Sequence, residues 1–276
     1  MPHKDADLSL PSGVQVVRLV AAVSGITLPA EGFVVEKDFR LVASKEKSPL
    51  PRVFAIFQIP DDSERTRNNC LNRLNRFLDC YSFHTGFPAD FSQYYTISPI
   101  REVSDEAMWS PGSEEVRVHI GVAPDHARGV LSGSVDMCGR HYQEYLQNAL
   151  TFYRRSLLAR TNDEALIDLI TALESMFSLE SQEIRYRLSL RVACFVAGVD
   201  TKLRKQVYDT VHEMYGKRNK IIHSGKSTDG VTFSEIGTLR DFVRISISKL
   251  IATSQTKKGV VAGIDSVIIK WRMTDT

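Results

Sequence analysis

Residues 201–225 read TKLRKQVYDTVHEMYGKRNKIIHSG, and their spacing determines how the second half of this chain folds. Apolar residues recur there at intervals of three and four, which is the period of one helical face: Leu203, Val207, Val211 and Met214. The pattern predicts a helix over about 201–222 that packs this face against a core. Gly225 is well placed to end it, because glycine readily adopts the left-handed conformation found just past a helix C-terminus.

Arg218 falls at the next position of this apolar stripe, so its guanidinium is expected to face protein rather than open water. An arginine in such a place needs an acidic partner, an interface or a ligand. His223 lies about 140° around the axis of a regular helix from Arg218, so the two side chains are not expected to stack. A guanidinium matches phosphate oxygens, and an imidazole moves protons near neutral pH. The pair therefore has the chemistry to cleave a phosphodiester without a metal ion.

Four more segments in the same half of the chain show the helical period, and two of them begin with a capping signal. Thr161 with Glu164, and Thr232 with Glu235, each have the spacing of a capping box. The helices predicted from these patterns cover about 140–159, 161–177, 183–197, 201–222 and 232–250. Five amphipathic helices joined by short connections are typical of a helical bundle.

The first part of the chain, to about residue 130, has a strand-rich pattern. Short β-branched and aromatic runs separated by turn residues predict strands over 14–20, 32–35, 39–43, 52–59, 94–97 and 116–122. One helix is predicted over about 64–83, and residues 123–139, which are rich in Gly and Ser, are expected to be a domain junction. The fold class is therefore α+β, with a strand-rich N-terminal domain over 1–130 and an all-α bundle over 138–255. The tail, 256–276, is expected to pack on the body as strand or helix.

The segment around Arg218 also resembles a known family. Arg218, the polar Asn219, three further residues and His223 look like the Rx4–6H motif of the HEPN ribonucleases, and 215–225 resembles their Apea-like branch. The resemblance extends through 172–174 and 188–198 and covers about 138–255. It implies a HEPN-like bundle and a metal-independent endoribonuclease that dimerises, so that paired motifs form one site. In that interpretation Arg218 stabilises the phosphate, His223 handles the proton, and Asn219 orients one of them.

Two chains also satisfy the chemistry better than one. Cleavage of RNA by its own 2′-hydroxyl needs a base, an acid and a positive charge, whereas one chain supplies one such His and one such Arg. A symmetric homodimer would supply both sets in one cleft. The expected substrate is single-stranded RNA or a tRNA loop, whose backbone and bases are accessible. The family further implies a defence or toxin system, held in check through an inhibitory or activating partner, with the N-terminal domain as sensor or substrate guide.

Basic residues are concentrated around the motif. Between 185 and 226 the ten Lys and Arg residues outnumber the three acidic ones, which would draw a polyanion towards this region. Lys217, Lys220 and Lys226 are the predicted RNA contacts. Glu174, on the inner edge of the predicted helix 161–177, either helps to position Arg218 or forms a simple structural ion pair with it.

Other interpretations stay open. His223 can serve as a helix cap while Arg218 pairs with Glu174, Asp209 or Glu213, in which case the motif is purely structural. Alternatively, the bundle is a non-catalytic module that dimerises or binds RNA or a nucleotide, and Arg218 and His223 only recognise phosphate.

Composition gives no indication of a metal, a cofactor or a membrane. The formal net charge is +2, and the four cysteines show no C-x-x-C spacing. No apolar run reaches the 18 residues typical of a transmembrane helix. We therefore expect a cytoplasmic protein with no cofactor, no metal and no membrane contact.

Overall fold

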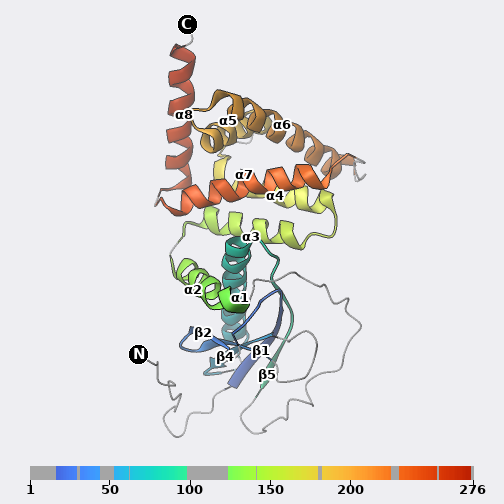
Figure 1. Cartoon of the computed structure of the whole chain (residues 1–276), viewed down its shortest axis with the longest axis vertical. Coiled ribbons are helices and arrows are strands. Elements are labelled where there is room, and N and C mark those ends of the chain that lie inside the picture. The colour runs from blue at the N-terminus through green and yellow to red at the C-terminus, as the bar shows by residue number, and fades with distance from the viewer. Residues whose placement is uncertain are drawn as a thin grey trace. The chain divides into compact units, whose positions relative to one another are not determined.

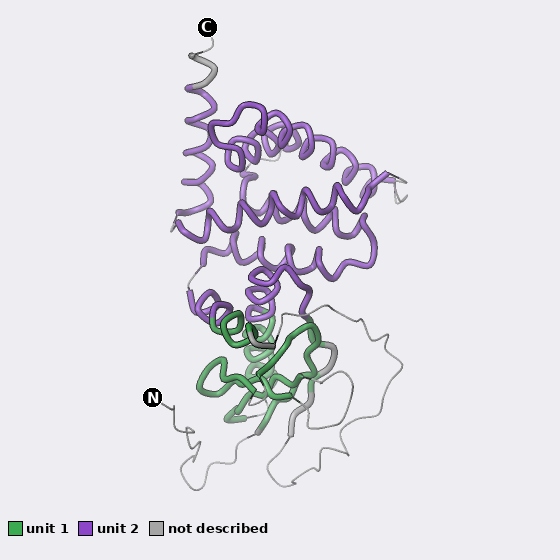
Figure 2. The backbone as a smooth tube through the Cα atoms, in the orientation of Figure 1, with its two compact units in different colours: residues 1–75, 90–132 green, residues 76–89, 133–276 purple. Residues whose placement is uncertain are grey.

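The computed structural model describes residues 17–29, 32–43, 53–61, 63–97, 124–140, 142–179, 182–224, 230–253 and 255–274. Within these residues the chain forms five strands and eight helices, which confirms the predicted α+β class (Figure 1). The chain divides into two compact units, as Figure 2 shows. One comprises residues 1–75 and 90–132, and the other 76–89 and 133–276. The predicted boundary at 130 is close to this division, but residues 76–89 group with the C-terminal helices.

The sheet belongs to the first unit. Its strands are β1 (Val17–Ser24), β2 (Phe33–Glu36), β3 (Phe39–Ala43), β4 (Val53–Ile59) and β5 (Asp90–Ile97). They are arranged in the order β2-β3-β4-β1-β5, and every neighbouring pair is antiparallel. Alternate residues of β4 are buried, because successive side chains of a strand point to opposite faces. On the buried face Phe39 lies opposite Phe57, and the two rings stack with 4.1 Å between centroids.

Most of the predicted strands are present. The predictions over 32–35, 39–43 and 52–59 match β2, β3 and β4 to within a residue at each end. The prediction over 14–20 overlaps β1, and β5 begins at Asp90, four residues before the predicted start at 94. The predicted strand over 116–122 lies outside the described residues.

Helix α1 (Glu64–Thr85) agrees with the helix predicted over 64–83. In the first unit, the Arg73 guanidinium lies over the Phe57 ring, 5.3 Å from its centroid. The same guanidinium donates to both oxygens of Asp38, at 2.8 and 2.7 Å. This pairing keeps the pKa of Asp38 below its ordinary value. A bidentate ion pair thus fixes α1 to the turn between β2 and β3.

The predicted Gly- and Ser-rich junction over 123–139 is helical, because most of it folds as α2 (Pro124–Gly139), and the division between the two units falls within this helix, after residue 132. Proline suits the first position of a helix, since the amide hydrogen it lacks has no partner there. Buried side chains then recur at helical spacing, at Ala127, Leu131 and Ser134. A Cβ at Gly133 would lie 2.6 Å from the His84 ring of α1. Gly133 therefore permits close packing against that ring.

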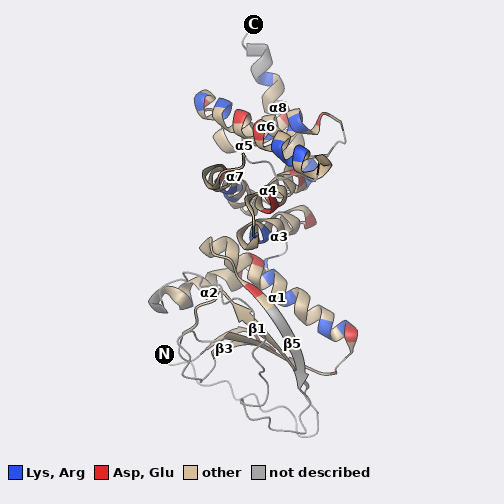
Figure 3. Cartoon of the chain, turned by 90° about the vertical axis from the view of Figure 1, so that its right-hand side faces the viewer, with Lys and Arg blue, Asp and Glu red and all other residues tan. Residues whose placement is uncertain are grey.

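The second unit contains the predicted bundle. Its helices are α3 (Glu144–Leu158), α4 (Asn162–Phe177), α5 (Ile184–Ala197), α6 (Thr201–Ser224) and α7 (Phe233–Ile251). Helices α4 and α7 lie between α3 on one side and the α5–α6 pair on the other (Figures 1 and 3). The buried side chains of these helices form one continuous core, so each helix is held by tertiary packing.

Of the two predicted capping boxes, the second is complete, and at the first the Thr161 cap forms while the Glu164 side chain accepts from the backbone N–H of Arg160 instead. The Thr161 side chain accepts a hydrogen bond from the backbone N–H of Glu164 at 3.2 Å. Thr232 and Glu235 form a complete capping box, in which each side chain accepts from the other residue's backbone N–H. These contacts satisfy amide groups that the first helical turn leaves without partners.

The tail folds as helix α8 (Lys257–Thr274). Its buried residues are Val260, Val261 and Ile264. Asp265 accepts two hydrogen bonds from Arg191 of α5, at 2.9 and 2.8 Å. The tail therefore packs on the second unit. No described helix combines the length and the apolar character needed to cross a membrane.

A buried ion pair holds the end of α1 within the second unit. Asp79 accepts from Arg154 Nε and from the Thr151 hydroxyl, both at 2.6 Å. The Asp79 and Arg154 side chains are 10% and 8% exposed. Asp79→Ala would leave the guanidinium buried without its carboxylate, so we expect a loss of about 3–5 kcal/mol in unfolding free energy, measured by urea denaturation.

The matched control is Asp209→Ala, which breaks the exposed pair between Asp209 and Lys205. Solvent screens that pair, so its loss should change stability only slightly. Similar losses for the two variants would contradict an anchoring role for Asp79.

Candidate functional site

Helix α6 is positioned as its sequence predicts. Its N-terminus is capped by Asp200, whose carboxylate accepts from the backbone N–H of Leu203 at 2.9 Å. The stripe residues Val207, Val211 and Met214 are fully buried or nearly so, whereas Leu203, the first residue of the predicted stripe, is 37% exposed. The helix ends at Ser224, two residues later than predicted, so His223 lies in its last turn. Gly225, the expected terminating residue, lies outside the described residues.

Arg218 faces protein, as its place on the stripe predicts. Its Nη2 lies 3.5 Å from Glu174 Oε2 on α4, and the two side chains are 21% and 22% exposed. Of the three acidic partners considered for Arg218, Glu174 is the one that it contacts. Asp209 pairs with Lys205 at 2.7 Å, whereas Glu213 is one of the partners of Lys217.

Tyr215 completes the contact between α6 and α4. Its hydroxyl donates to Glu174 Oε1 at 2.9 Å, and its ring lies under the Arg218 guanidinium, 5.6 Å from Cζ to centroid. Burial and the Glu174 carboxylate raise the pKa of Tyr215 to about 12, so the hydroxyl stays protonated and donates. Sequence reasoning gave Tyr215 no role. The available signal was its i, i+3 spacing from Arg218, which places the two side chains side by side on a helix.

Arg218 is held more loosely than Arg191. Arg191 donates to both oxygens of Asp265 and to the Phe177 carbonyl, at 2.8 to 3.0 Å. Arg218 has a 3.5 Å contact with Glu174 and a 3.1 Å hydrogen bond to Asn219. Its Nε, like those of Arg76 and Arg240, is buried without a hydrogen-bond partner among the described residues. The guanidinium is thus oriented, while one N–H of each Nη group is engaged by no described residue.

Asn219 and His223 occupy different surroundings. The Asn219 side-chain oxygen accepts from Arg218 Nη1 at 3.1 Å, as expected for a residue that orients the guanidinium. His223 is exposed, and within the described part of the chain no hydrogen bond or ion pair engages its ring. The structure therefore brings together Arg218, Asn219, Glu174 and Tyr215, but His223 does not join this cluster.

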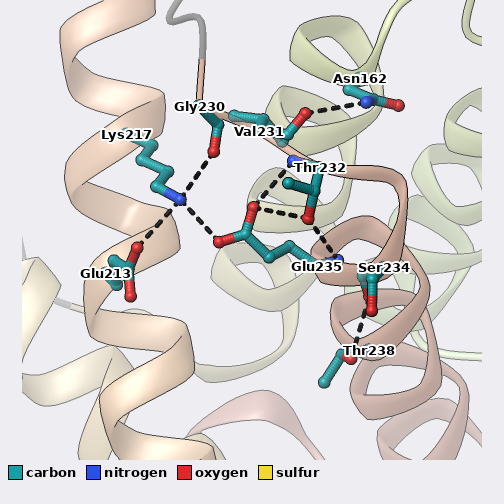
Figure 4. A network of polar contacts seen from close by, with 9 residues as sticks. All are labelled: Asn162, Glu213, Lys217, Gly230, Val231, Thr232, Ser234, Glu235 and Thr238. Carbon is teal, nitrogen blue, oxygen red and sulfur yellow. Dashed lines mark hydrogen bonds and ion pairs between the residues drawn. The ribbon is translucent and has the colours of Figure 1, made fainter.

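Lys217, a predicted RNA contact, has a different set of neighbours. Its ammonium contacts the Glu213 carboxylate at 2.9 Å, the Glu235 carboxylate at 2.7 Å and the Gly230 carbonyl at 3.0 Å (Figure 4). An ammonium has three donors, so these partners occupy all of them. Through Glu235, Lys217 links α6 to the capping box of α7. It is a structural residue, and we do not assign it to RNA.

The other predicted contacts differ in their placement. Lys220 is exposed on α6, whereas Lys226 lies outside the described residues. Figure 3 shows basic residues spread along α6. Arg191, counted in the basic excess from sequence, is buried in its pair with Asp265. Part of that excess therefore neutralises internal carboxylates and does not face solvent.

Comparison with known proteins gave no match among family models, curated proteins or solved structures. The described residues also include no cluster of three His, Cys, Asp or Glu side chains arranged to hold a metal ion. The site therefore rests on its own geometry.

The hydrogen bond between Tyr215 and Glu174 makes stability depend on pH in a defined direction. Tyr215→Phe should lower the unfolding free energy at pH 8 by about 1–2 kcal/mol, because Glu174 loses a donor. The pKa of Tyr215 is raised from 10.0 to about 12 by folding. The stabilisation is therefore complete below pH 10 and declines as the pH rises towards 12. Urea denaturation from pH 8 to 11 measures the difference between the two proteins.

Tyr208→Phe is the control, since Tyr208 makes only ring contacts among the described residues. It should leave stability nearly unchanged across the same range. No loss of stability in Tyr215→Phe would show that ring packing, not the hydroxyl, accounts for the contact.

Proposed function

We propose that this chain is a metal-independent endoribonuclease of the HEPN type, which cleaves single-stranded RNA or tRNA loops at a site formed by two copies. The observation that carries the proposal is the state of Arg218. Glu174, Tyr215 and Asn219 orient its guanidinium, which stays 21% exposed, and each Nη group keeps one N–H that no described residue engages. A guanidinium is a rigid fork of donors that matches phosphate oxygens, so an oriented fork with unused Nη donors is suited to bind a phosphate.

The position of His223 also supports the proposal. It is exposed in the last turn of α6, one and a half turns beyond Arg218. An imidazole there can reach a ligand without first breaking a contact within the described part of its own chain. The two residues are too far apart around the axis to act on one atom together. A second copy can resolve this, because its own His223 can approach the phosphate that the first Arg218 binds.

The reaction needs only these side chains. One imidazole takes the proton from the 2′-hydroxyl, and the oxygen attacks the adjacent phosphorus. The bond from phosphorus to the 5′-oxygen breaks, and the second imidazole donates a proton to that oxygen. The products are a 2′,3′-cyclic phosphate and a 5′-hydroxyl. The two Arg218 guanidinium groups stabilise the negative charge that develops on the non-bridging oxygens.

The first test is cleavage of tRNA and unstructured RNA by the purified protein in EDTA. Because His223 carries the proton, His223→Ala should reduce the rate at least about 100-fold while leaving RNA binding nearly unchanged. Arg218→Ala should weaken both cleavage and binding. His126→Ala, which removes an exposed histidine from α2, is the control and should cleave at the wild-type rate.

Two outcomes would contradict the nuclease. Cleavage that persists in His223→Ala would remove this residue from the chemistry. Binding without cleavage, in EDTA and also after addition of cell extract, would favour a non-catalytic RNA-binding module instead.

The composite site makes a separate prediction about mixed dimers. If both copies contribute His223, excess His223→Ala protein added to a fixed amount of wild type should suppress cleavage almost completely after subunit exchange. If each chain acts alone, the added variant should leave the rate unchanged. Sedimentation at micromolar concentration provides the control, because a monomer would exclude the composite site regardless of the mixing result.

A further inference from the structure

One side of α6 carries a continuous row of residues that ends at His223 and includes three residues without a role in the proposed chemistry, Tyr208, His212 and Gly216. Tyr208, His212, Gly216, Asn219 and His223 recur at intervals of three and four, so they fall within about 80° of arc. They extend over about 22 Å of the helix axis. We call this row, together with Arg185 and Tyr186 of α5 that contact it, the α6 strip. Arg218 lies outside it, and His223 lies at its C-terminal end.

Aromatic rings gather at the other end of the α6 strip. The Tyr208 ring stacks on the His212 ring, with centroids 5.4 Å apart and planes at 19°. Tyr186 of α5 meets Tyr208 edge to face at 6.3 Å. Tyr186 is 42% exposed, whereas the apolar residues of α5 and α6 that face the core are buried. The three rings form a platform with one ring accessible to solvent.

A fixed positive charge lies between this platform and His223. Arg185 Nε donates to the His212 carbonyl at 2.9 Å. A Cβ at Gly216 would lie 2.9 Å from Arg185 Nη2 and 3.1 Å from Cζ. The absence of a side chain at Gly216 therefore lets the guanidinium rest against the backbone of α6. Neither Nη group makes a hydrogen bond to another described residue, so both retain donors.

His212 contributes a ring to the platform and little charge. Burial lowers the pKa of His212, and the adjacent Arg185 lowers it further, while Asp209 acts in the opposite direction. The imidazole is therefore neutral at pH 7 and stacks as an uncharged aromatic ring. The positive charge of the strip comes from Arg185.

We infer that the α6 strip binds single-stranded RNA next to the cleaved phosphate, with a base stacked on Tyr186 and a phosphate at Arg185. This inference rests on the proposed function and names the surface that would guide its substrate. Accessible aromatic rings beside an arginine are the combination with which proteins hold unpaired bases and their backbone. The row leads to His223, about 10 Å along the axis from Gly216.

RNA is favoured over a second copy of the chain as the occupant. Across a two-fold axis the same surface patch contributes from both copies, and the strip contains no carboxylate, so a second strip would offer Arg185 no opposite charge. RNA offers a negative charge for Arg185 and flat aromatic bases that can stack on the accessible ring.

Four variants made in the His223→Ala protein, which leaves the RNA intact, test the strip. The measurement is fluorescence anisotropy of a labelled unstructured RNA at fixed salt. Tyr186→Ala should weaken binding about tenfold because a stacking ring is lost, whereas Tyr186→Phe keeps the ring and should bind like the parent. Arg185→Gln should weaken binding. It should also lower the slope of log Kd against log salt concentration by the amount that corresponds to about one phosphate contact.

Gly216→Ala is the most selective of the four. Alanine favours the helix, so the fold should be retained, but the new Cβ displaces the Arg185 guanidinium. We expect binding to weaken several-fold while thermal stability is retained. Phe233→Ala is the matched control, because Phe233 is an exposed aromatic residue on α7, and it should bind like the parent.

The results separate this inference from the nuclease proposal. Parental binding in both Tyr186→Ala and Arg185→Gln overturns the strip, and loss of the dimer in these variants would identify the surface as a protein interface. If the wild-type chain never cleaves RNA but these variants bind RNA more weakly than the parent, the strip is retained as an RNA-binding surface and the nuclease proposal is rejected.

Discussion

The position of Arg218 on the apolar stripe of α6 is the constraint on which the rest of the site depends. A guanidinium that faces a helical core cannot be left without compensation, so the bundle must supply polar partners for it. Glu174 supplies one oxygen to Arg218 at 3.5 Å and the other to the Tyr215 hydroxyl at 2.9 Å. Because one carboxylate serves two groups, neither α6 residue holds it exclusively. Arg218 is therefore fixed in direction while part of its fork remains available, which is the property that phosphate binding needs.

The basic residues near this site divide into two sets with different tasks. Lys217 and Arg191 have their donors satisfied by carboxylates and backbone carbonyls, and they connect α6 to α7 and α5 to α8. Arg185 and Lys220 lie at the surface. Charge counted along the sequence cannot make this distinction, because i, i+4 partners and partners distant in the sequence decide which ammonium or guanidinium is neutralised. The surface that we propose for RNA is smaller than the local composition suggests and lies along one side of α6.

Local signals predicted much of the fold. The helical period of α6 and the caps at Thr161 and Thr232 follow from spacing, because side chains three and four apart share a helix face. Spacing also placed Arg218 on the inner face of α6 but left three acidic partners open, of which Glu174 is the one contacted. Tertiary packing decided what was missed. Residues 123–139 were interpreted as a Gly- and Ser-rich junction, whereas most of them form helix α2, in which Gly133 lies against the His84 ring. The partners of Lys217 and the approach of Arg185 to Gly216 join separate helices, and no pattern within one helix reveals them.

The central claim is that this chain uses the 2′-hydroxyl of its own substrate as the nucleophile. The most direct measurement is cleavage in EDTA of a single-stranded RNA at a mapped site, compared with the same RNA carrying one 2′-deoxynucleotide on the 5′ side of that bond. The account predicts 2′,3′-cyclic phosphate ends from the first and no cut at the substituted position in the second. Cleavage of the deoxy-substituted bond, or 5′-phosphate ends from the unmodified RNA, would contradict it.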